Sequence, residues 1–258
     1  MGALAFTAVL TLAGCGQLGQ THPRLQSLAA AGAEPSPTVE PSPTPEPTPE
    51  PVRAEPVAIG PPPCPAGPYQ LEIETALAKI GTYGEIKVDS RQSFGDCATI
   101  VAFQKRMGIF PANGKPGPTT RDVSVRIAAT DPSQCPRSDF ATACIDLTHQ
   151  TFYIAKAGQV IVGPTVTRTG MPGWRTPSGS FRVANRSRSE WSVPFKVWLP
   201  YWQHFYLGMG LHETTTYIHN MPLGSHGCVN LLHADAVAAY GLLGVGSTVH
   251  LYGRRPGT

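Results

Sequence analysis

Prolines crowd one stretch of the chain and limit where a folded domain can lie. Twelve of them fall between Pro35 and Pro63, in repeats of Pro-Ser-Pro-Thr and Pro-Glu-Pro-Thr. Residues 16–63 show no hydrophobic periodicity, so they cannot bury a core, and proline-rich sequence favours extended polyproline II at roughly 3.1 Å per residue. We interpret residues 16–63 as a disordered linker. Any folded domain has to be built from the residues that follow it.

The N-terminus begins with a short apolar segment. Residues 3–12 are too few to span a bilayer as a helix, and the segment ends in Leu-Ala-Gly-Cys15. This ending resembles the lipobox of bacterial lipoproteins, in which the cysteine thiol is acylated. The resemblance implies that residues 1–15 are a lipoprotein signal segment and that a lipid on Cys15 anchors the exported chain to the membrane of the cell envelope. A generic signal peptide that happens to end in cysteine is the alternative.

The cysteines fit an oxidising compartment. Of the six, Cys15 and Cys228 are set apart by their neighbours, and the other four are candidates for disulfides: Cys64, Cys97, Cys135 and Cys144. Four cysteines allow three pairings. We favour Cys64–Cys97 and Cys135–Cys144 because each pair then stays within one segment, and free buried thiols are the alternative.

The charge of the chain argues against nucleic acid as a partner. The formal net charge is only +3, and the sequence contains no basic run. Hydrophobic residues make up 41%, which is enough for a folded core. We therefore expect a globular exported protein.

Residues 64–130 have the pattern of a small helical unit. Apolar residues recur at helical spacing from Leu71 to Ile80, and Gly81 ends that run. The segments Phe-Gln-Lys-Arg-Met-Gly-Ile and Asn-Gly-Lys-Pro-Gly-Pro-Thr-Thr, at 103–109 and 113–120, resemble the peptidoglycan-binding-like domain, a three-helix module. An ordinary helical spacer domain is the alternative.

From Cys144 onward the pattern becomes that of short strands. Apolar residues alternate or cluster at 145–147, 151–154, 159–162 and 165–169, a turn at 176–181 leads into another strand, and 248–252 form the last. One helical stretch lies near Leu231–Leu243. Residues 131–258 are therefore predicted to form a mainly β catalytic domain, a sandwich or barrel with one helix near the C-terminus.

One cysteine has the neighbours of a reactive thiol. Cys228 lies between Gly227 and Val229 in Gly-Ser-His-Gly-Cys-Val-Asn, where glycine lets the backbone approach a substrate and consecutive N–H groups can bind an anion. A thiol needs a base or a cation to become a thiolate. His212 and His226 are both candidates, and spacing alone does not choose between them.

The sequence argues against two other kinds of site. Zinc is the alternative interpretation of four residues, His212, His219, His226 and Cys228. Seven-residue spacing would align the histidines on a helix, but Pro222, Gly224 and Gly227 interrupt one, so no metal is expected. The penicillin-binding type of transpeptidase needs Ser-x-x-Lys, and none of the six lysines has a serine three positions before it.

The run Ser-His-Gly-Cys-Val-Asn, at 225–230, resembles the signature of the L,D-transpeptidase (YkuD-like) catalytic domain. That signature follows a histidine about a dozen residues upstream. Twelve residues separate His212 from Ser225, whereas only five separate His219 from it. With the opening strands and the turn at 176–181, the resemblance covers roughly residues 143–252.

The resemblance implies a role for each matching residue. Cys228 is the nucleophile, His212 is the general base, and the Glu213 carbonyl orients His212. Backbone N–H groups of His226, Gly227 and Cys228 stabilise the oxyanion, and Ser225 and Asn230 support the site. No cofactor is implied. Six further residues are candidates for the walls of the cleft, although each is more often packing or surface: Arg168, Trp174, Arg175, Trp191, Trp198 and Trp202.

The implied reaction forms 3→3 cross-links in peptidoglycan. Cys228 takes the acyl group of a tetrapeptide stem, D-alanine leaves, and the side-chain amine of another stem peptide resolves the thioester. Carbapenem-type inhibitors are expected to react with the same thiol. Two alternatives remain: a cell-wall cysteine peptidase or carboxypeptidase that uses water as acceptor, and a non-catalytic wall-binding lipoprotein whose functional part is residues 64–130.

Overall fold

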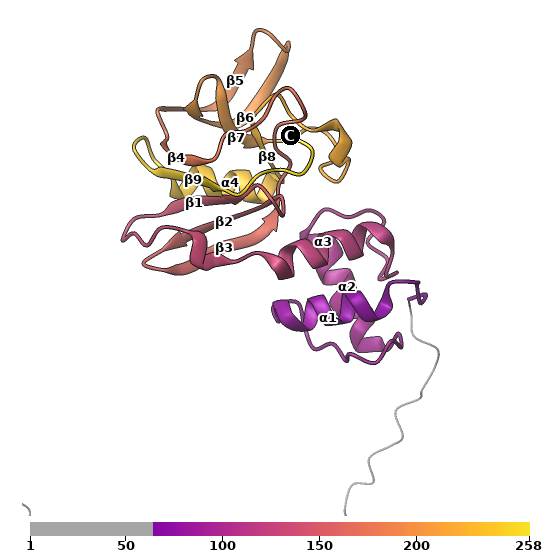
Figure 1. Cartoon of the computed structure of the whole chain (residues 1–258). Coiled ribbons are helices and arrows are strands. Elements are labelled where there is room, and N and C mark those ends of the chain that lie inside the picture. Colours follow the sequence, from indigo (N-terminus) through magenta and orange to yellow (C-terminus); the bar gives the residue numbers. More distant parts are fainter. Residues whose placement is uncertain (1–63) are drawn as a thin grey trace, which may run out of the picture. The chain divides into compact units, whose positions relative to one another are not determined.

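The computed structural model describes residues 64–258 (Figure 1). Cys15 and the proline-rich linker lie outside these residues, so the lipid anchor, the export and the linker stay predictions from the sequence. Within residues 64–258, none of the helices has the length and apolar character needed to cross a membrane.

Three helices form the first part of the described chain: α1 (Gln70–Ile80), α2 (Phe94–Arg106) and α3 (Pro118–Ala129). Helix α1 stops where Gly81 takes the left-handed conformation. Helix α2 begins with a capping box in which Ser93 and Asp96 satisfy each other's backbone N–H groups. The facing sides of the helices bury a core that includes Ile73, Leu77, Ile100, Phe103 and Val123. Most of this core lies between the three helices, and Val166 and Ile218 join it from later in the chain. We treat α1–α3 as one unit, called the helical module below.

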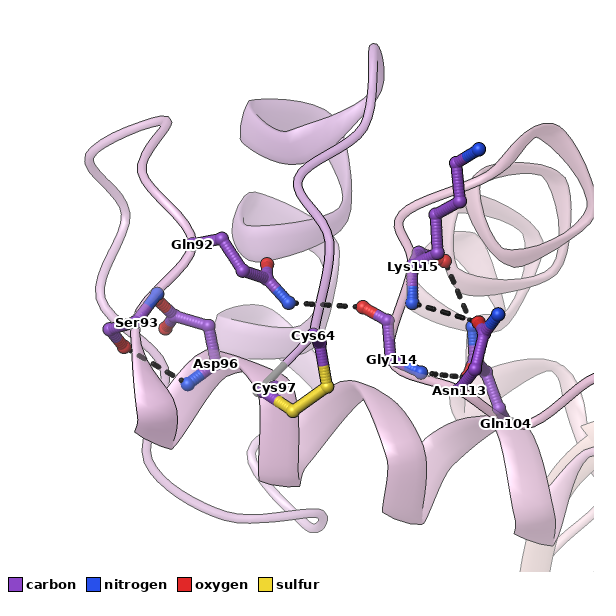
Figure 2. Close-up of a disulfide and its surroundings, with 9 residues drawn as sticks. All are labelled: Cys64, Gln92, Ser93, Asp96, Cys97, Gln104, Asn113, Gly114 and Lys115. Carbon is purple, nitrogen blue, oxygen red and sulfur yellow. Dashed lines mark hydrogen bonds between the residues drawn. A yellow bond between two sulfur atoms is a disulfide. The ribbon is translucent and has the colours of Figure 1, made fainter. Parts of the chain in front are cut away.

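Figure 2 shows how the residues that resemble a peptidoglycan-binding-like domain are used inside the helical module. The Gln104 side chain accepts a hydrogen bond from the Gly114 N–H at 2.8 Å and donates to the Lys115 carbonyl at 3.0 Å. The Cys64–Cys97 disulfide packs directly against Gly114, where a Cβ would lie 2.2 Å from the Cys64 sulfur. These residues therefore stabilise the loop between α2 and α3. The resemblance to a peptidoglycan-binding-like domain itself stays a prediction.

A second disulfide joins Cys135 to Cys144. Cys135 follows a short 3₁₀ turn at Pro132–Gln134, and Cys144 lies in the first strand. The bond therefore ties the connection between the helical module and the sheets to the central strand of the five-stranded sheet. Both disulfides have the pairing that the sequence analysis favoured.

Residues 142–252 form two mixed sheets. The five-stranded sheet has the order β3-β2-β1-β9-β4, and the four-stranded sheet has the order β5-β6-β7-β8. The strands are β1 (Thr142–Asp146), β2 (Thr151–Lys156), β3 (Gln159–Val166), β4 (Gly179–Arg182), β5 (Asn185–Ser192), β6 (Val197–Tyr206), β7 (Met209–Glu213), β8 (Val229–Leu231) and β9 (Thr248–Tyr252). Together with helix α4 (His233–Leu242), they confirm the prediction of a mainly β domain with one helix near the C-terminus.

The two sheets share one hydrophobic core with α4. Ile145 and Phe152 come from the five-stranded sheet, Leu211 and Val229 from the four-stranded sheet, and Ala239 from α4, and all five are fully buried. The pairs β1–β9 and β7–β8 are parallel, and the other pairs are antiparallel. The hydrogen-bonded pairing of β7 with β8 sets the ends of these two strands relative to each other.

The chain after β3 passes from one sheet to the other. The strand predicted at 165–169 is wrong in its bounds, because residues 165–166 complete β3 and the next residues pair elsewhere. Arg168 makes an isolated antiparallel bridge with Asn230, and Gly170 makes a parallel bridge with Ser225. This crossing segment therefore borders the sequence that carries Cys228.

Candidate active site

Cys228 and His212 line the same pocket, which encloses about 350 Å³. His212 lies near the C-terminal end of β7, and Cys228 immediately precedes β8. The parallel register aligns Leu211 with Val229 and His212 with Asn230. This register places Cys228 beside Gly210, two residues before His212. Side chains two residues apart lie on the same face of a strand, so His212 and Cys228 reach the pocket from adjacent strands.

The turn before β8 is held by the Ser225 side chain. The Ser225 hydroxyl donates to the Cys228 carbonyl at 2.6 Å and accepts the Gly227 N–H at 3.1 Å. Gly227 has φ of 104°, and a Cβ there would lie 2.6 Å from the end of the Met209 side chain, so only glycine fits. The hydrogen bond to Ser225 engages the Gly227 N–H, which the sequence analysis expected to face an oxyanion. That expectation for Gly227 is corrected, because the turn itself uses the donor.

Thr176 fastens this turn to the crossing segment. Its hydroxyl donates to the Gly227 carbonyl at 2.8 Å and accepts the Gly170 N–H at 2.9 Å. Thr176 opens the Thr-Pro-Ser-Gly-Ser-Phe turn, so the sequence pointed to the turn but not to this contact with the Cys228 loop.

His212 has a fixed orientation and a neutral ring. Its Nδ1 lies 2.7 Å from the Glu213 carbonyl, and since a carbonyl only accepts, Nδ1 carries the proton and Nε2 keeps a free lone pair. Burial lowers the pKa of His212 to about 4, and the nearby Arg168 charge adds to the effect, while the Glu213 carbonyl opposes it. At neutral pH the ring is therefore an uncharged base.

Burial also raises the pKa of the Cys228 thiol above its usual value. A neutral thiol and a neutral imidazole are thus the resting forms of the two groups. To act as nucleophile and base, such a pair would have to transfer the thiol proton to the imidazole as the sulfur attacks.

The three histidines that suggested zinc have separate surroundings. His226 stacks on Phe195 with ring centroids 4.1 Å apart and meets Trp174 edge-on at 4.8 Å. The His219 Nε2 lies 2.8 Å from the Met107 carbonyl in the helical module. Among residues 64–258, no three His, Cys, Asp or Glu side chains are grouped as metal ligands would be.

Comparison with known proteins decides the family. Residues 141–251 match the family model described as the YkuD L,D-transpeptidase catalytic domain. The chain is 50% identical to an L,D-transpeptidase from Stackebrandtia nassauensis of known crystal structure, with 76% of this chain and 96% of that chain covered and a TM-score of 0.73. The chain belongs to the L,D-transpeptidase family.

Two other solved L,D-transpeptidases are more distant. One from Xylanimonas cellulosilytica is 24% identical over 76% of this chain and 99% of that chain, with a TM-score of 0.45. Another, in complex with imipenem, is 20% identical over 44% of this chain and 59% of that chain, with a TM-score of 0.41. Among curated protein sequences, no significant match to this chain was found.

The walls of the pocket in this L,D-transpeptidase family member include only part of the expected set. Arg168 and Trp198 line the pocket. Trp174 is not a lining residue but packs against His226, which is one. Trp202 is buried and packs against Gly210. Trp191 packs against Trp198 at 5.2 Å, and Arg175 is not among the lining residues. Three further groups line the pocket without any signal in the sequence: Phe195, Leu223 and the threonines at 214–216.

Arg168 is buried and holds residues 214–217, part of one pocket wall, by hydrogen bonds. Only 2% of its surface is exposed, and its guanidinium donates to the Thr216 hydroxyl at 2.7 Å, the Thr214 hydroxyl at 3.2 Å and the Tyr217 carbonyl at 2.9 Å. Burial lowers the pKa of Arg168, and the charge of Arg255 lowers it further. The sequence around Arg168 does not predict this role, since the hydrogen-bond partners of Arg168 lie about fifty residues further along the chain.

The stability of this family member is expected to fall between pH 6.5 and about 4 because of His212. The folded-state pKa is lower than the unfolded value, so the unfolded chain binds the proton first and acid favours unfolding in that window. The effect is absent above pH 6.5, and its size is about 3 kcal/mol in the free energy of unfolding. Urea unfolding at pH 7, 5.5 and 4 measures it, and an equal acid loss in His212→Gln would contradict it.

Proposed function

We propose that this chain is a peptidoglycan L,D-transpeptidase that forms 3→3 cross-links through Cys228. The observation that carries the proposal is the pocket that Cys228, a free thiol, and His212, a neutral base oriented by the Glu213 carbonyl, both line. Membership of the L,D-transpeptidase family supports the same chemistry.

In the acylation half of the proposed reaction, His212 transfers one proton from the thiol to the leaving amine. The His212 Nε2 removes the thiol proton as the Cys228 sulfur attacks the carbonyl of the third stem residue. The bond to the terminal D-alanine then breaks, and His212 returns the proton to the leaving amine. A thioester on Cys228 remains, and D-alanine leaves as a neutral amine.

The second half transfers the acyl group to another stem peptide. The side-chain amine of the acceptor attacks the thioester, His212 takes the amine proton, and the sulfur leaves and regains a proton. The N–H groups of His226 and Cys228 are the proposed oxyanion donors, since the Gly227 N–H is engaged by Ser225. Asn230, only 5% exposed on β8 and part of the pocket lining, supports the site from its floor.

The proposal is tested by supplying the full chain with a disaccharide-tetrapeptide as both donor and acceptor. We expect one D-alanine released for each 3→3 dimer formed, measured by mass spectrometry of the products. An acceptor whose side-chain amine is acetylated should give no dimer. D-alanine release with tripeptide as the sole product would replace transpeptidation by carboxypeptidase activity, and no release of D-alanine would overturn the proposal.

A further inference from the structure

The segment between His212 and Cys228 contacts the pocket with some side chains and the helical module with others. Residues 214–224, called the pocket loop below, connect β7 to the turn that carries Cys228, and the threonines at 214–216 together with Leu223 line the pocket. Ile218 and His219 point the other way. Ile218 is 2% exposed and belongs to the core of the helical module, and the His219 Nε2 donates to the Met107 carbonyl at 2.8 Å.

The end of α2 supplies the surface that receives these residues. Arg106 pairs through both terminal nitrogens with the carboxylate of Asp235, which is 1% exposed in the first turn of α4. Arg106 also donates to Thr165 at 3.3 Å, and Thr165 in turn donates to Asp235 at 2.8 Å. Taken together, these bonds satisfy a buried carboxylate from both domains.

The two residues after Arg106 complete the contact. The side chain of Met107 is fully buried, and its carbonyl is the acceptor for His219. Gly108 has φ of 65°, and a Cβ there would lie 2.9 Å from the Leu232 side chain, so the backbone approaches closely. Leu232 is the residue that follows β8, only four positions after Cys228.

The Arg106–Gly108 turn thus touches the chain on both sides of Cys228. It holds the pocket loop before the nucleophile through His219, and it holds Leu232 and Asp235 after the nucleophile. We propose that this turn is a positioning element of the active site, which keeps the pocket loop and the turn at Cys228 in register with His212. The inference rests on the proposed function, in that positioning matters for acyl transfer.

The residues of the segment at 103–109 make contacts within the helical module and with the catalytic domain. Phe103 is buried inside the helical module, Gln104 holds the 113–115 loop, and Arg106–Gly108 face the catalytic domain. These side chains are therefore occupied within the chain. The buried side chains of Phe103, Gln104 and Met107 are unavailable to a glycan strand, whereas the Arg106 side chain is 33% exposed.

Two substitutions at His219 distinguish a positioning role of this residue from a catalytic role of its imidazole ring. His219→Leu removes the donor to Met107 at similar size, whereas His219→Gln keeps an N–H at about the same place. Without the donor, the rate of Cys228 acylation is expected to fall on the order of tenfold, as for residues that act through others. His219→Gln should stay close to the wild type, and hydrogen exchange of residues 214–224 should rise only in His219→Leu.

Alkylation of Cys228 by iodoacetamide in the full chain gives a readout that needs no peptide substrate. We expect His219→Leu to change this rate and His219→Gln to leave it near that of the wild type. If the wild type forms no 3→3 dimer while the alkylation rates differ in this way, the proposed function fails and the positioning role stands. If dimer formation, alkylation and loop exchange are all unchanged in folded His219→Leu, the positioning role is overturned. Equal losses in both variants would also overturn it, since they would make the imidazole itself the active group.

Arg106→Met tests the same turn from its other contact, with Arg121→Met as the matched control. Arg121 also pairs with a carboxylate, that of Glu72, but this exposed pair lies within the helical module. We expect Arg106→Met to slow acylation in the folded protein and Arg121→Met to leave it unchanged. Equal rates for the two variants, measured well below their unfolding temperatures, would count against the proposal.

Discussion

Cys228→Ala is expected to abolish 3→3 cross-linking while the protein stays folded. Cys228 is the one free thiol among residues 64–258, since the other four cysteines there form disulfides. Its backbone carbonyl, and not its sulfur, is bonded to Ser225, so the variant keeps the turn. Without the sulfur no thioester can form, and dimer formation should fall below detection by mass spectrometry of the products.

The same variant identifies the site of covalent modification. The wild type incubated with a carbapenem should gain one adduct, on the peptide that contains Cys228, and Cys228→Ala should gain none. The unfolding temperature of the variant, measured in parallel, shows whether the fold is intact. Cross-linking that persists in the folded variant, or an adduct on another residue, would contradict the assignment of the nucleophile.

The parts of the fold that were predicted from the sequence are those with local signals. Strand β9 and helix α4 lie within two residues of their predicted bounds, because alternation and helical spacing are visible within a single segment. Strands β5, β6, β7 and β8 are not among the predicted strands, and β5 and β6 show the reason most clearly. They pair across a short turn and leave many apolar residues exposed, such as Trp191 and Trp198, so they lack the alternation of buried and exposed residues that marks a strand.

The candidate site shows the same limit. The run at 225–230 pointed to Cys228, and the upstream spacing pointed to His212, because both signals are confined to short stretches. The contacts of Arg168 with the pocket loop join residues about fifty positions apart, and the contact of Met107 with His219 spans 112 positions. Contacts of this kind depend on how the sheets and helices pack, and nothing in the local sequence marks them.

The sequence alone also does not predict the roles of individual backbone N–H groups. Three consecutive N–H groups at 226–228 suggested three oxyanion donors. The structure shows that the hydroxyl of Ser225 takes the middle one, from Gly227. A serine three residues before a cysteine is compatible with several turn types, so its partner follows only from the backbone angles, here the φ of 104° at Gly227.

His212→Ala is expected to lower the rate of Cys228 acylation by about 10²–10⁴-fold, the usual contribution of a positioned acid–base group. The physical reason is that burial keeps the Cys228 thiol protonated, so attack requires a neighbouring base. His212 can supply it at neutral pH, because its own pKa is lowered to about 4 and Nε2 is free. Stopped-flow acylation by a carbapenem measures the rate directly.

The pH profile distinguishes loss of a base from general damage to the site. In the wild type the acid limb should lie near pH 4, where His212 takes up a proton, and the rate should be flat above it. His212→Ala has no base, so its rate should depend on the thiolate and rise about tenfold per pH unit below the thiol pKa. A folded variant with a low rate and the flat profile of the wild type would show that His212 shapes the pocket without removing the proton.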